Sequence, residues 1–180
     1  MPLRPFLIAL VLIAVDQLSK IWLVSVMEGR ECTIINGLPE ICRPIEILSF
    51  FNIVMVWNTG VSFGMFSDSG APLILGLINL AVAAALAVWL ARAESRALRA
   101  GLTLVIAGAV GNAIDRFAYG AVADFFDVHL SGAAAQWAID TFGTNHWPAF
   151  NVADMAISVG VVLLLFDSLF ARGDRSKRAP

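Results

Sequence analysis

Carboxylates and carboxamides recur at one spacing in two apolar stretches of the chain. Asn112 lies three residues before Asp115, and Asn151 lies three residues before Asp154. This spacing places each amide on the same helical face as its acid. If the two stretches cross a membrane in opposite directions, both acids lie roughly 5 to 8 Å below one surface, at about 1.5 Å per residue. Asp124 follows the first stretch closely, so three acids gather near one depth.

Paired carboxylates at such a place can do acid and base chemistry. Two acids a few Å apart cannot both ionise easily, so one remains a base while the other keeps its proton. Such a pair can deprotonate a water and protonate a leaving amine, as in aspartic peptidases. Helix geometry by itself favours Asp115 as the partner of Asp154. Asp115 also has Arg116 beside it, so an ion pair with this or another cation is its alternative role, whereas Asp124 has no adjacent cation.

Asp16 and Lys20 are the ionisable side chains of the first apolar stretch. A charge at the centre of a membrane helix costs roughly 2.5 to 3.5 kcal/mol, so such residues generally mark functional sites. Their spacing of four residues also allows a self-neutralising pair on one helical face. Both roles remain open from the spacing alone.

Other catalytic chemistries find less support in the sequence. The only histidines are His129 and His146, and no His-Glu-x-x-His motif is present, so a zinc peptidase lacks ligands at a useful spacing. The residues 60–64 match Gly-x-Ser-x-Gly, the nucleophile elbow of serine hydrolases. That reading would need one of the two histidines, or Lys20, as the base.

The elements that must position these residues follow from composition. The chain has 180 residues, of which 59% are hydrophobic and 14% are charged, against roughly half and a quarter in an ordinary soluble domain. This excludes a soluble globule and a disordered chain. A net charge of -2 with only 12 Lys and Arg residues excludes a nucleic-acid binder. We expect a single membrane domain over 1–180 with four spans, near 5–27, 70–91, 99–118 and 149–171.

The cations predict the orientation of the spans, because Lys and Arg collect on the cytoplasmic side. Most of the 12 basic residues fall on one side of the predicted membrane: Arg4, Arg92, Arg96, Arg99, Arg172, Arg175, Lys177 and Arg178. Both termini are therefore expected in the cytoplasm. The outer segments are 28–69 and 119–148, each too long for a simple turn.

The first outer segment has the composition of strands. Residues 44–57 are rich in Ile, Phe and Val, and Asn36-Gly37 is a hairpin signal. We expect an all-α membrane protein with a small periplasmic β-sheet between the first two helices. Cys32 and Cys42 both fall in this segment, which leaves a disulfide and two free thiols equally open.

The polar residues of the apolar stretches and of the segments between them resemble the motifs of the lipoprotein signal peptidases (signal peptidase II). These are four-span aspartic peptidases of the bacterial inner membrane. The similarity extends from the first span to the fourth and rests on five motifs in order: Asp16-Gln17-x-x-Lys20, Asn58-x-Gly60-x-x-Phe63, Gly108-x-x-Gly111-Asn112-x-x-Asp115-Arg116, Val122-Ala-Asp124-Phe125 and Phe150-Asn151-x-Ala153-Asp154. The match departs from the family in two places. Ala107-Gly108 stands where Gly-Gly is usual, and 131–147 reads as an inserted loop, either a lid over the site or a surface excursion.

The resemblance implies roles that the spacing does not give. Asp124 and Asp154 would be the catalytic dyad, in place of the helix-based choice of Asp115. Asp115 would be structural and orient Arg116, Gly108 would permit close helix packing, and Ser62 would be ordinary packing. The residues implied to shape the substrate pocket are Asp16, Lys20, Asn58, Gly60, Asn112, Arg116 and Asn151.

The resemblance also implies an activity. The protein would be an inner-membrane endopeptidase, with its site facing the periplasm, that cuts diacylglyceryl-modified prolipoproteins just before the lipidated cysteine. Its expected partners are these substrates and the lipid bilayer, with no nucleic acid, cofactor or metal, and the chain would act as a monomer. A small proton-coupled transporter using Asp16, Lys20 and Asp115, or a thiol oxidoreductase using the two cysteines, remains the alternative.

Overall fold

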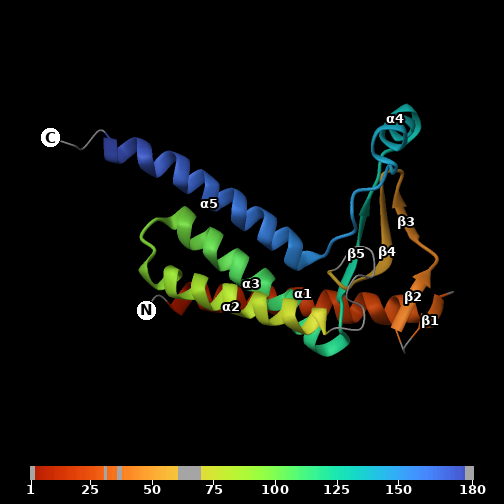
Figure 1. The fold of residues 1–180 in the computed structure, drawn as a ribbon, viewed down its shortest axis with the longest axis horizontal. Helices are drawn as coiled ribbons and strands as arrows, with labels where there is room; N and C mark the ends of the chain where they lie inside the picture. Colours follow the sequence, from red (N-terminus) through yellow and green to blue (C-terminus); the bar gives the residue numbers. More distant parts are fainter. Residues whose placement is uncertain (1–2, 31, 36–37, 61–69, 177–180) are drawn as a thin grey trace.

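The computed structural model describes residues 3–30, 32–35, 38–60 and 70–176. Within these residues, four long helices form a bundle and two small sheets lie at one end of it (Figure 1). The long helices are α1 (Leu3–Glu28), α2 (Ala71–Arg92), α3 (Arg96–Tyr119) and α5 (Val152–Ser176). All four are long and apolar enough to cross a membrane. Long apolar helices are therefore confirmed at the four predicted positions, with ends that differ by a few residues.

The central helix of the bundle is α3, which packs against α1, α2 and α5. Small residues on α3 allow this crowding. A Cβ atom at Gly108 would collide with the backbone carbonyl oxygen of Ala153 on α5, and one at Gly111 would stand 2.6 Å from Oδ2 of Asp16 on α1. Glycine at these positions therefore lets three helix backbones approach closely, as is common in membranes.

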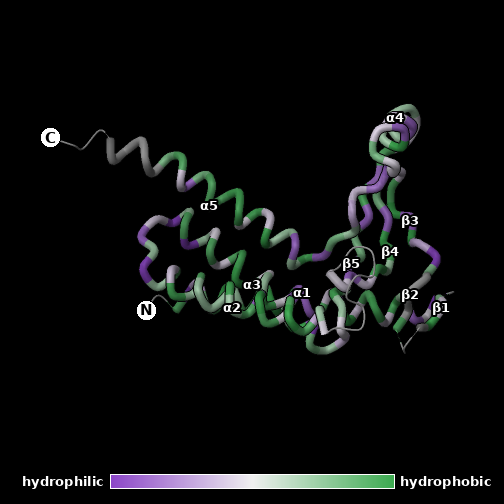
Figure 2. Tube along the Cα trace, viewed as in Figure 1, coloured by the Kyte–Doolittle hydropathy of each residue, from purple (hydrophilic) through white to green (hydrophobic). Residues whose placement is uncertain are grey.

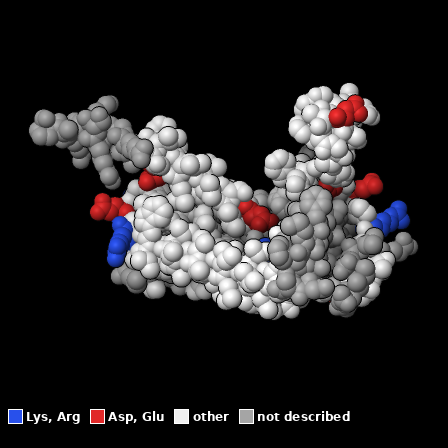
Figure 3. Space-filling view, in the orientation of Figure 1, with Lys and Arg blue, Asp and Glu red and all other residues white. Residues whose placement is uncertain are grey.

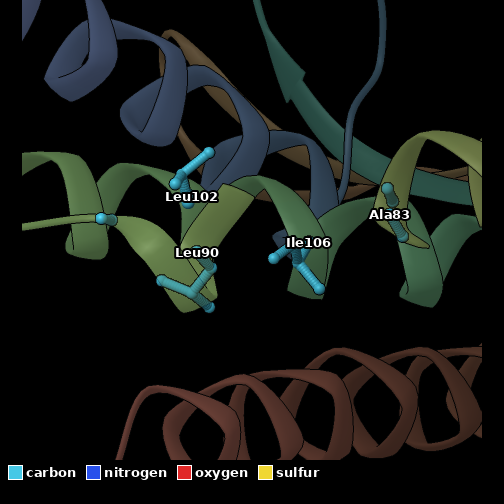
Figure 4. Packing of buried hydrophobic residues seen from close by; sticks show 6 residues of the cluster. Ala83, Leu90, Leu102 and Ile106 are labelled. Carbon is cyan, nitrogen blue, oxygen red and sulfur yellow. The ribbon is translucent and has the colours of Figure 1, made fainter. Parts of the chain in front are cut away.

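Apolar side chains fill the contact between α2 and α3. Ala83 and Leu90 pack with Leu102 and Ile106 in one buried cluster (Figure 4). Figure 2 shows that the four long helices are largely hydrophobic along their length, while the turn between α2 and α3 is hydrophilic. Many large apolar side chains on the outside of the bundle are exposed, among them Leu77 and Val162. An apolar exterior of this kind suits a lipid environment.

The strands form two antiparallel sheets. In the first, β1 (Cys32–Ile35) pairs with β2 (Leu38–Cys42), and a disulfide joins Cys32 to Cys42 across the pair. In the second, the order is β3 (Ile45–Leu48), β4 (Phe51–Asn58) and β5 (Val122–Val128). The predicted turn at Asn36-Gly37 lies outside the described residues, although the strands that flank it are present.

The small sheet expected between the first two helices is present, and the second of the two sheets gains one further strand, β5, from the segment after α3. Asn58 of β4 is paired with Val122, and Val56 is paired with Asp124. The sequence reading missed β5 because its two acids interrupt an otherwise β-favouring run of Val and Phe. The strand matters because it carries Asp124.

The inserted stretch 131–147 is more ordered than a loop. It contains α4 (Gly132–Phe142), whose first turn includes the strongly helix-forming residues Ala133–Ala135. Gly143 caps the end of this helix with a positive φ of 78°. Figure 1 shows α4 at the tip of the sheet. The start of α1 and the end of α5 lie at the opposite end of the molecule.

Candidate active site

Asp124 is held on β5 by two amides. Its Oδ2 accepts a hydrogen bond from Nδ2 of Asn58 at 3.0 Å, and its Oδ1 accepts one from Nδ2 of Asn151 at 2.7 Å. The side chain is almost fully buried, with 1% of its surface exposed. Burial is the main cause that raises the pKa of Asp124 to about 6; the nearby charge of Asp154 raises it as well, while the two amide hydrogen bonds and Lys20 oppose the shift.

Asp154 lies in the first turn of α5, in a reciprocal cap with Asn151. The backbone N–H of Asp154 donates to Oδ1 of Asn151 at 3.0 Å, and the backbone N–H of Asn151 donates to Oδ2 of Asp154 at 3.2 Å. This arrangement satisfies otherwise unpaired donors at the start of the helix. Backbone bonds between Phe150 and Phe126 fix the preceding residues against β5. The Asn-x-x-Asp spacing is therefore a helix cap as well as a shared face.

Asn151 and Asn112 connect the two acids. Nδ2 of Asn151 contacts Asp124, as above, and also Oδ1 of Asn112 at 3.2 Å. Nδ2 of Asn112 in turn donates to Oδ1 of Asp154 at 2.8 Å. Two amides thus bridge a carboxylate on a strand to a carboxylate on a helix, and their limited donors fix how both acids are oriented.

Lys20 lies beneath this bridge in a buried ion cluster. Its Nζ is 2.8 Å from Oδ2 of Asp16 and 2.7 Å from Oδ2 of Asp115. It also donates to Oδ1 of Asn112 at 3.3 Å. Gln17 donates to Asp115 at 2.9 Å, and the backbone N–H of Ala153 donates to Asp16 at 2.9 Å. The cluster therefore ties α1, α3 and α5 together below the pocket.

These positions refine several expectations. Asp16 and Lys20 are nearly inaccessible, with 1% and 2% of their surfaces exposed, and neither lines the pocket beside Asp124 and Asp154. Asp115 is fully buried and pairs with Lys20, and no described contact links its carboxylate directly to Arg116. Asp115 therefore takes the alternative role suggested by the sequence, an ion pair, with Lys20 and not Arg116 as the cation.

Asn58 and Gly60 form a tight turn after β4. The backbone N–H of Gly60 donates to Oδ1 of Asn58 at 2.8 Å, which leaves Nδ2 of Asn58 directed at Asp124. Gly60 has a φ of 78°, and a Cβ there would stand 2.5 Å from Cδ1 of Leu75. Only glycine fits this position without strain. Ser62 and Phe63 lie outside the described residues.

Arg116 emerges from α3 one turn above Asn112. Its Nη1 donates to the carbonyl oxygen of Asn112 at 3.2 Å, whereas its buried Nε has no hydrogen-bond partner among the described residues. The charges of Asp154, Asp115 and Asp124 all act on this guanidinium. Arg116 thus supplies a positive charge that lies outside the Lys20 cluster and interacts with both pocket acids.

A pocket of about 520 Å³ opens beside the two acids. Its lining includes Asn58, Asp124 and Asp154, with Trp147 and Phe150 on one wall and Met155 on α5. Figure 3 shows acidic side chains in the hollow between the helices and the sheet end, while most of the helical surface carries no charge. The two carboxylates share a water-accessible pocket with apolar walls, which is an arrangement that suits acid and base chemistry on an amide bond.

The sequence pattern gives no role to Asp127. It places Trp147 in the stretch expected to be either a lid over the site or a surface excursion, and Trp147 lines the pocket. Asp127 meets His129 and His146 beside the sheet. His129 and His146 are separated by α4 and look unrelated in the sequence. The alternation of Asp127 with His129 on one face of a strand is the only local signal for this cluster.

The family model and the relatives that match this chain agree with one another. The chain matches a family model described as signal peptidase (SPase) II over residues 8–170. It is 43% identical to a lipoprotein signal peptidase of Rhodopseudomonas palustris, covering 97% of this chain and 95% of the relative. It is also 43% identical to that of Nitrobacter hamburgensis, with 93% of each chain covered.

A solved bacterial membrane enzyme, determined by the in meso method at 2.3 Å resolution, shares the fold. The TM-score is 0.68 at 25% identity, over 99% of this chain and 93% of the other. The fold, the order of the motifs and the extent of the family match agree, and this chain belongs to the signal peptidase II family, the membrane peptidases that cleave prolipoprotein signal peptides.

Proposed function

We propose that Asp124 and Asp154 are the catalytic dyad of this peptidase. The observation that carries the proposal is that Asn151 hydrogen-bonds to both carboxylates, which line one pocket. Two acids held by one residue keep a fixed separation, which lets a single water contact both. The raised pKa of Asp124, about 6, favours it as the acid that holds the shared proton.

In the proposed reaction the ionised carboxylate of Asp154 takes a proton from a water whose oxygen attacks the scissile carbonyl carbon. Asp124 gives its proton to the carbonyl oxygen, so a neutral tetrahedral diol forms. Collapse of the diol breaks the C–N bond as the proton held by Asp154 passes to the leaving nitrogen. A hydroxyl proton returns to Asp124, which restores the starting state.

Arg116 is the group that we assign to the developing charge on the substrate carbonyl. Its guanidinium interacts electrostatically with both acids, and its Nε has no hydrogen-bond partner among the described residues. Preorganised donors of this kind stabilise charge that forms only in the transition state. The amide of Asn58 already bonds to Asp124 and Gly60, so we assign it to holding Asp124 in place.

The proposed substrate is a prolipoprotein that already carries a diacylglyceryl group, and the cut falls just before the lipidated cysteine. Met155, half-exposed on α5 and lining the pocket, marks a lateral route from lipid. The apolar signal helix would enter along it, while the acyl chains stay in the bilayer. We place the chain in the bacterial inner membrane, with the pocket facing the periplasm, acting as a monomer.

The buried Asp16, Lys20 and Asp115 act in this scheme as positioning residues. They hold Asn112 and the start of α5, and so set where Asp154 stands. A proton relay for transport would need ionisable groups that continue through the inner half of the bundle, and α2 offers only Arg92, in its last turn. A thiol oxidoreductase would need a reducible partner pair, and both cysteines of the chain are joined to each other.

Cleavage of a purified lipidated prolipoprotein in detergent tests the dyad. We expect Asp124→Asn and Asp154→Asn each to lower kcat by about 10²- to 10⁴-fold, the usual contribution of general acid and base catalysis. Asp140→Asn, an exposed acid on α4, is the matched control, and Ser62→Ala tests the serine alternative. Both should cleave as wild type does. Cleavage by Asp154→Asn at the wild-type rate would overturn the mechanism.

A further inference from the structure

Asp127, His129 and His146 bring three metal-ligating groups together outside the catalytic pocket. Asp127 and His129 lie at the end of β5, and His146 lies in the segment that leads from α4 to α5. Nδ1 of His146 is 2.7 Å from Oδ1 of Asp127, and Nδ1 of His129 is 3.4 Å from Oδ2. One ligand atom from each residue lies within 4.8 Å of the other two.

The charge of Asp127 is incompletely balanced by its neighbours. Its side chain is buried, with 5% of the residue exposed. It accepts one amide hydrogen bond from Asn52 at 3.3 Å and is hydrogen-bonded to Nδ1 of His146 at 2.7 Å. Among the described residues no Lys or Arg forms an ion pair with it, and the two imidazoles carry charge only when protonated. A buried carboxylate is costly unless it is paired or bound to a metal.

His129 provides a second, independent observation. Its Nδ1 is buried and has no hydrogen-bond partner among the described residues, although it faces Asp127. Buried polar atoms in proteins are nearly always satisfied, so such an atom calls for a partner. A divalent cation between the three groups would satisfy this nitrogen and balance the carboxylate together.

We propose that Asp127, His129 and His146 bind one divalent cation of the zinc type. Two imidazoles and a carboxylate are ligands that zinc prefers, at bonds of roughly 2.0 to 2.2 Å, with a fourth position left for water. The backbones already hold the two histidines opposite each other in an isolated bridge, and their rings stack with centroids 5.0 Å apart. The His146 side chain is 49% exposed, which gives the cation a way in.

The cation would tie β5 to the wall of the catalytic pocket. Trp147 follows His146 directly, and its backbone N–H donates to the carbonyl oxygen of Val128 at 2.8 Å. Trp147 also lines the pocket that contains Asp124 and Asp154. Metal binding at Asp127 would therefore fix this wall from outside, without touching the reacting atoms.

Metal titration of the purified full-length protein tests the site. The protein is prepared without a histidine tag and stripped with a chelator, then dialysed against zinc, or titrated with cobalt(II) and followed by visible absorption. We expect one equivalent to bind and to raise the melting temperature. His146→Gln should lower zinc affinity by at least about tenfold, since even an outer-shell partner is worth 10- to 100-fold. Asp127→Asn and His129→Ala should do the same.

Two controls make the result decisive. Asp140→Asn removes an exposed carboxylate elsewhere on the same side of the molecule and should bind zinc as wild type does. Asp124→Asn should also bind zinc normally, so a failure of the catalytic proposal is distinguishable from a failure of this one. Because His146 is half-exposed, its substitution should not unfold the protein even if Asp127→Asn does. No zinc binding, or zinc binding that His146→Gln leaves unchanged, would overturn the proposal.

Discussion

At the scale of single residues, Lys20 is the cation of a buried cluster that contains two carboxylates. One buried ammonium faces two buried carboxylates, Asp16 and Asp115, at 2.8 and 2.7 Å. The excess negative charge is stabilised by Gln17 and by backbone N–H groups of Ala153 and Ala123. Such a cluster does not by itself imply stability, because the cost of desolvating the charges offsets their attraction. Removing one partner is nevertheless strongly destabilising, because it leaves a buried charge without compensation.

Replacement of that lysine is a direct test. Lys20→Met leaves both acids buried without a cation, and we expect a loss of roughly 3–5 kcal/mol of stability, the usual cost of removing one partner of a buried ion pair. Thermal unfolding in detergent measures the loss. The triple variant with Asp16→Asn and Asp115→Asn should regain part of it. If Lys20→Met melts at the wild-type temperature, the cluster contributes no net stability.

Asp124 gives a pH dependence whose sign can be worked out. Its pKa in the folded protein is raised to about 6 by burial, so the folded state holds this proton more tightly than the unfolded chain. The associated stability is complete at low pH and is lost as the pH rises through about 6.

Asp124→Asn should therefore become more stable than wild type as the pH increases. We expect equal melting temperatures near pH 4, after allowance for the changed hydrogen bonds. At neutral pH the variant should gain roughly 6–12 °C, because a rise of about 2 pKa units corresponds to about 3 kcal/mol. Melting curves from pH 4 to 8 measure the difference. A difference that does not change with pH would mean that the pKa of Asp124 is not raised.

At the scale of elements, the crossing of α3 and α5 sets the position of Asp154. Gly108 of α3 lies against the backbone of Ala153, one residue before Asp154. The first turn of α5 is also fixed by its cap and by the pairing of Phe150 with Phe126. The helix start is therefore located from two sides, by a strand and by a helix.

Gly108→Ala should disturb this crossing. A methyl group there must displace the backbone of α5, and a misplacement of about 1 Å at a reacting group can cost about 100-fold in rate. We expect kcat to fall by about that factor while the protein still folds. Gly29→Ala is the matched control, because its nearest atom would be at an ordinary 3.7 Å. Unchanged kcat in Gly108→Ala would show that α5 can shift without moving Asp154.

At the scale of the whole molecule, the bundle has two unlike ends. The sheets and α4 occupy one end, and the turn between α2 and α3 lies at the other, with the start of α1 (Figure 1). The basic residues Arg92, Arg96 and Arg99 surround that turn. From the positive-inside rule we propose that the sheet end faces outward.

Cysteine labelling tests this orientation. In a Cys32→Ser, Cys42→Ser background, Asp140→Cys on α4 and Glu94→Cys in the α2–α3 turn are both exposed acids replaced by the same thiol. A membrane-impermeant maleimide added to spheroplasts should label the first and leave the second unlabelled. Both should react after the membrane is permeabilised. The reverse pattern would invert the proposed topology.

The sequence alone was sufficient for the features that depend on local pattern. The four spans follow from runs of about 20 apolar residues, and the strands of the first outer segment follow from their content of Ile, Val and Phe. The motif order also identified the family. Each of these signals lies within a short stretch of chain, where hydropathy and propensity act directly.

Only the tertiary structure decided where each acid stands. Helical spacing favoured Asp115 beside Asp154, yet Asp115 is buried against Lys20 from α1, and Asp124 reaches the pocket because β5 pairs with β4. The sequence likewise did not predict that His146, which follows α4, lies beside Asp127 and His129. These contacts join residues far apart in the chain, so they depend on packing and strand register, which local pattern does not encode.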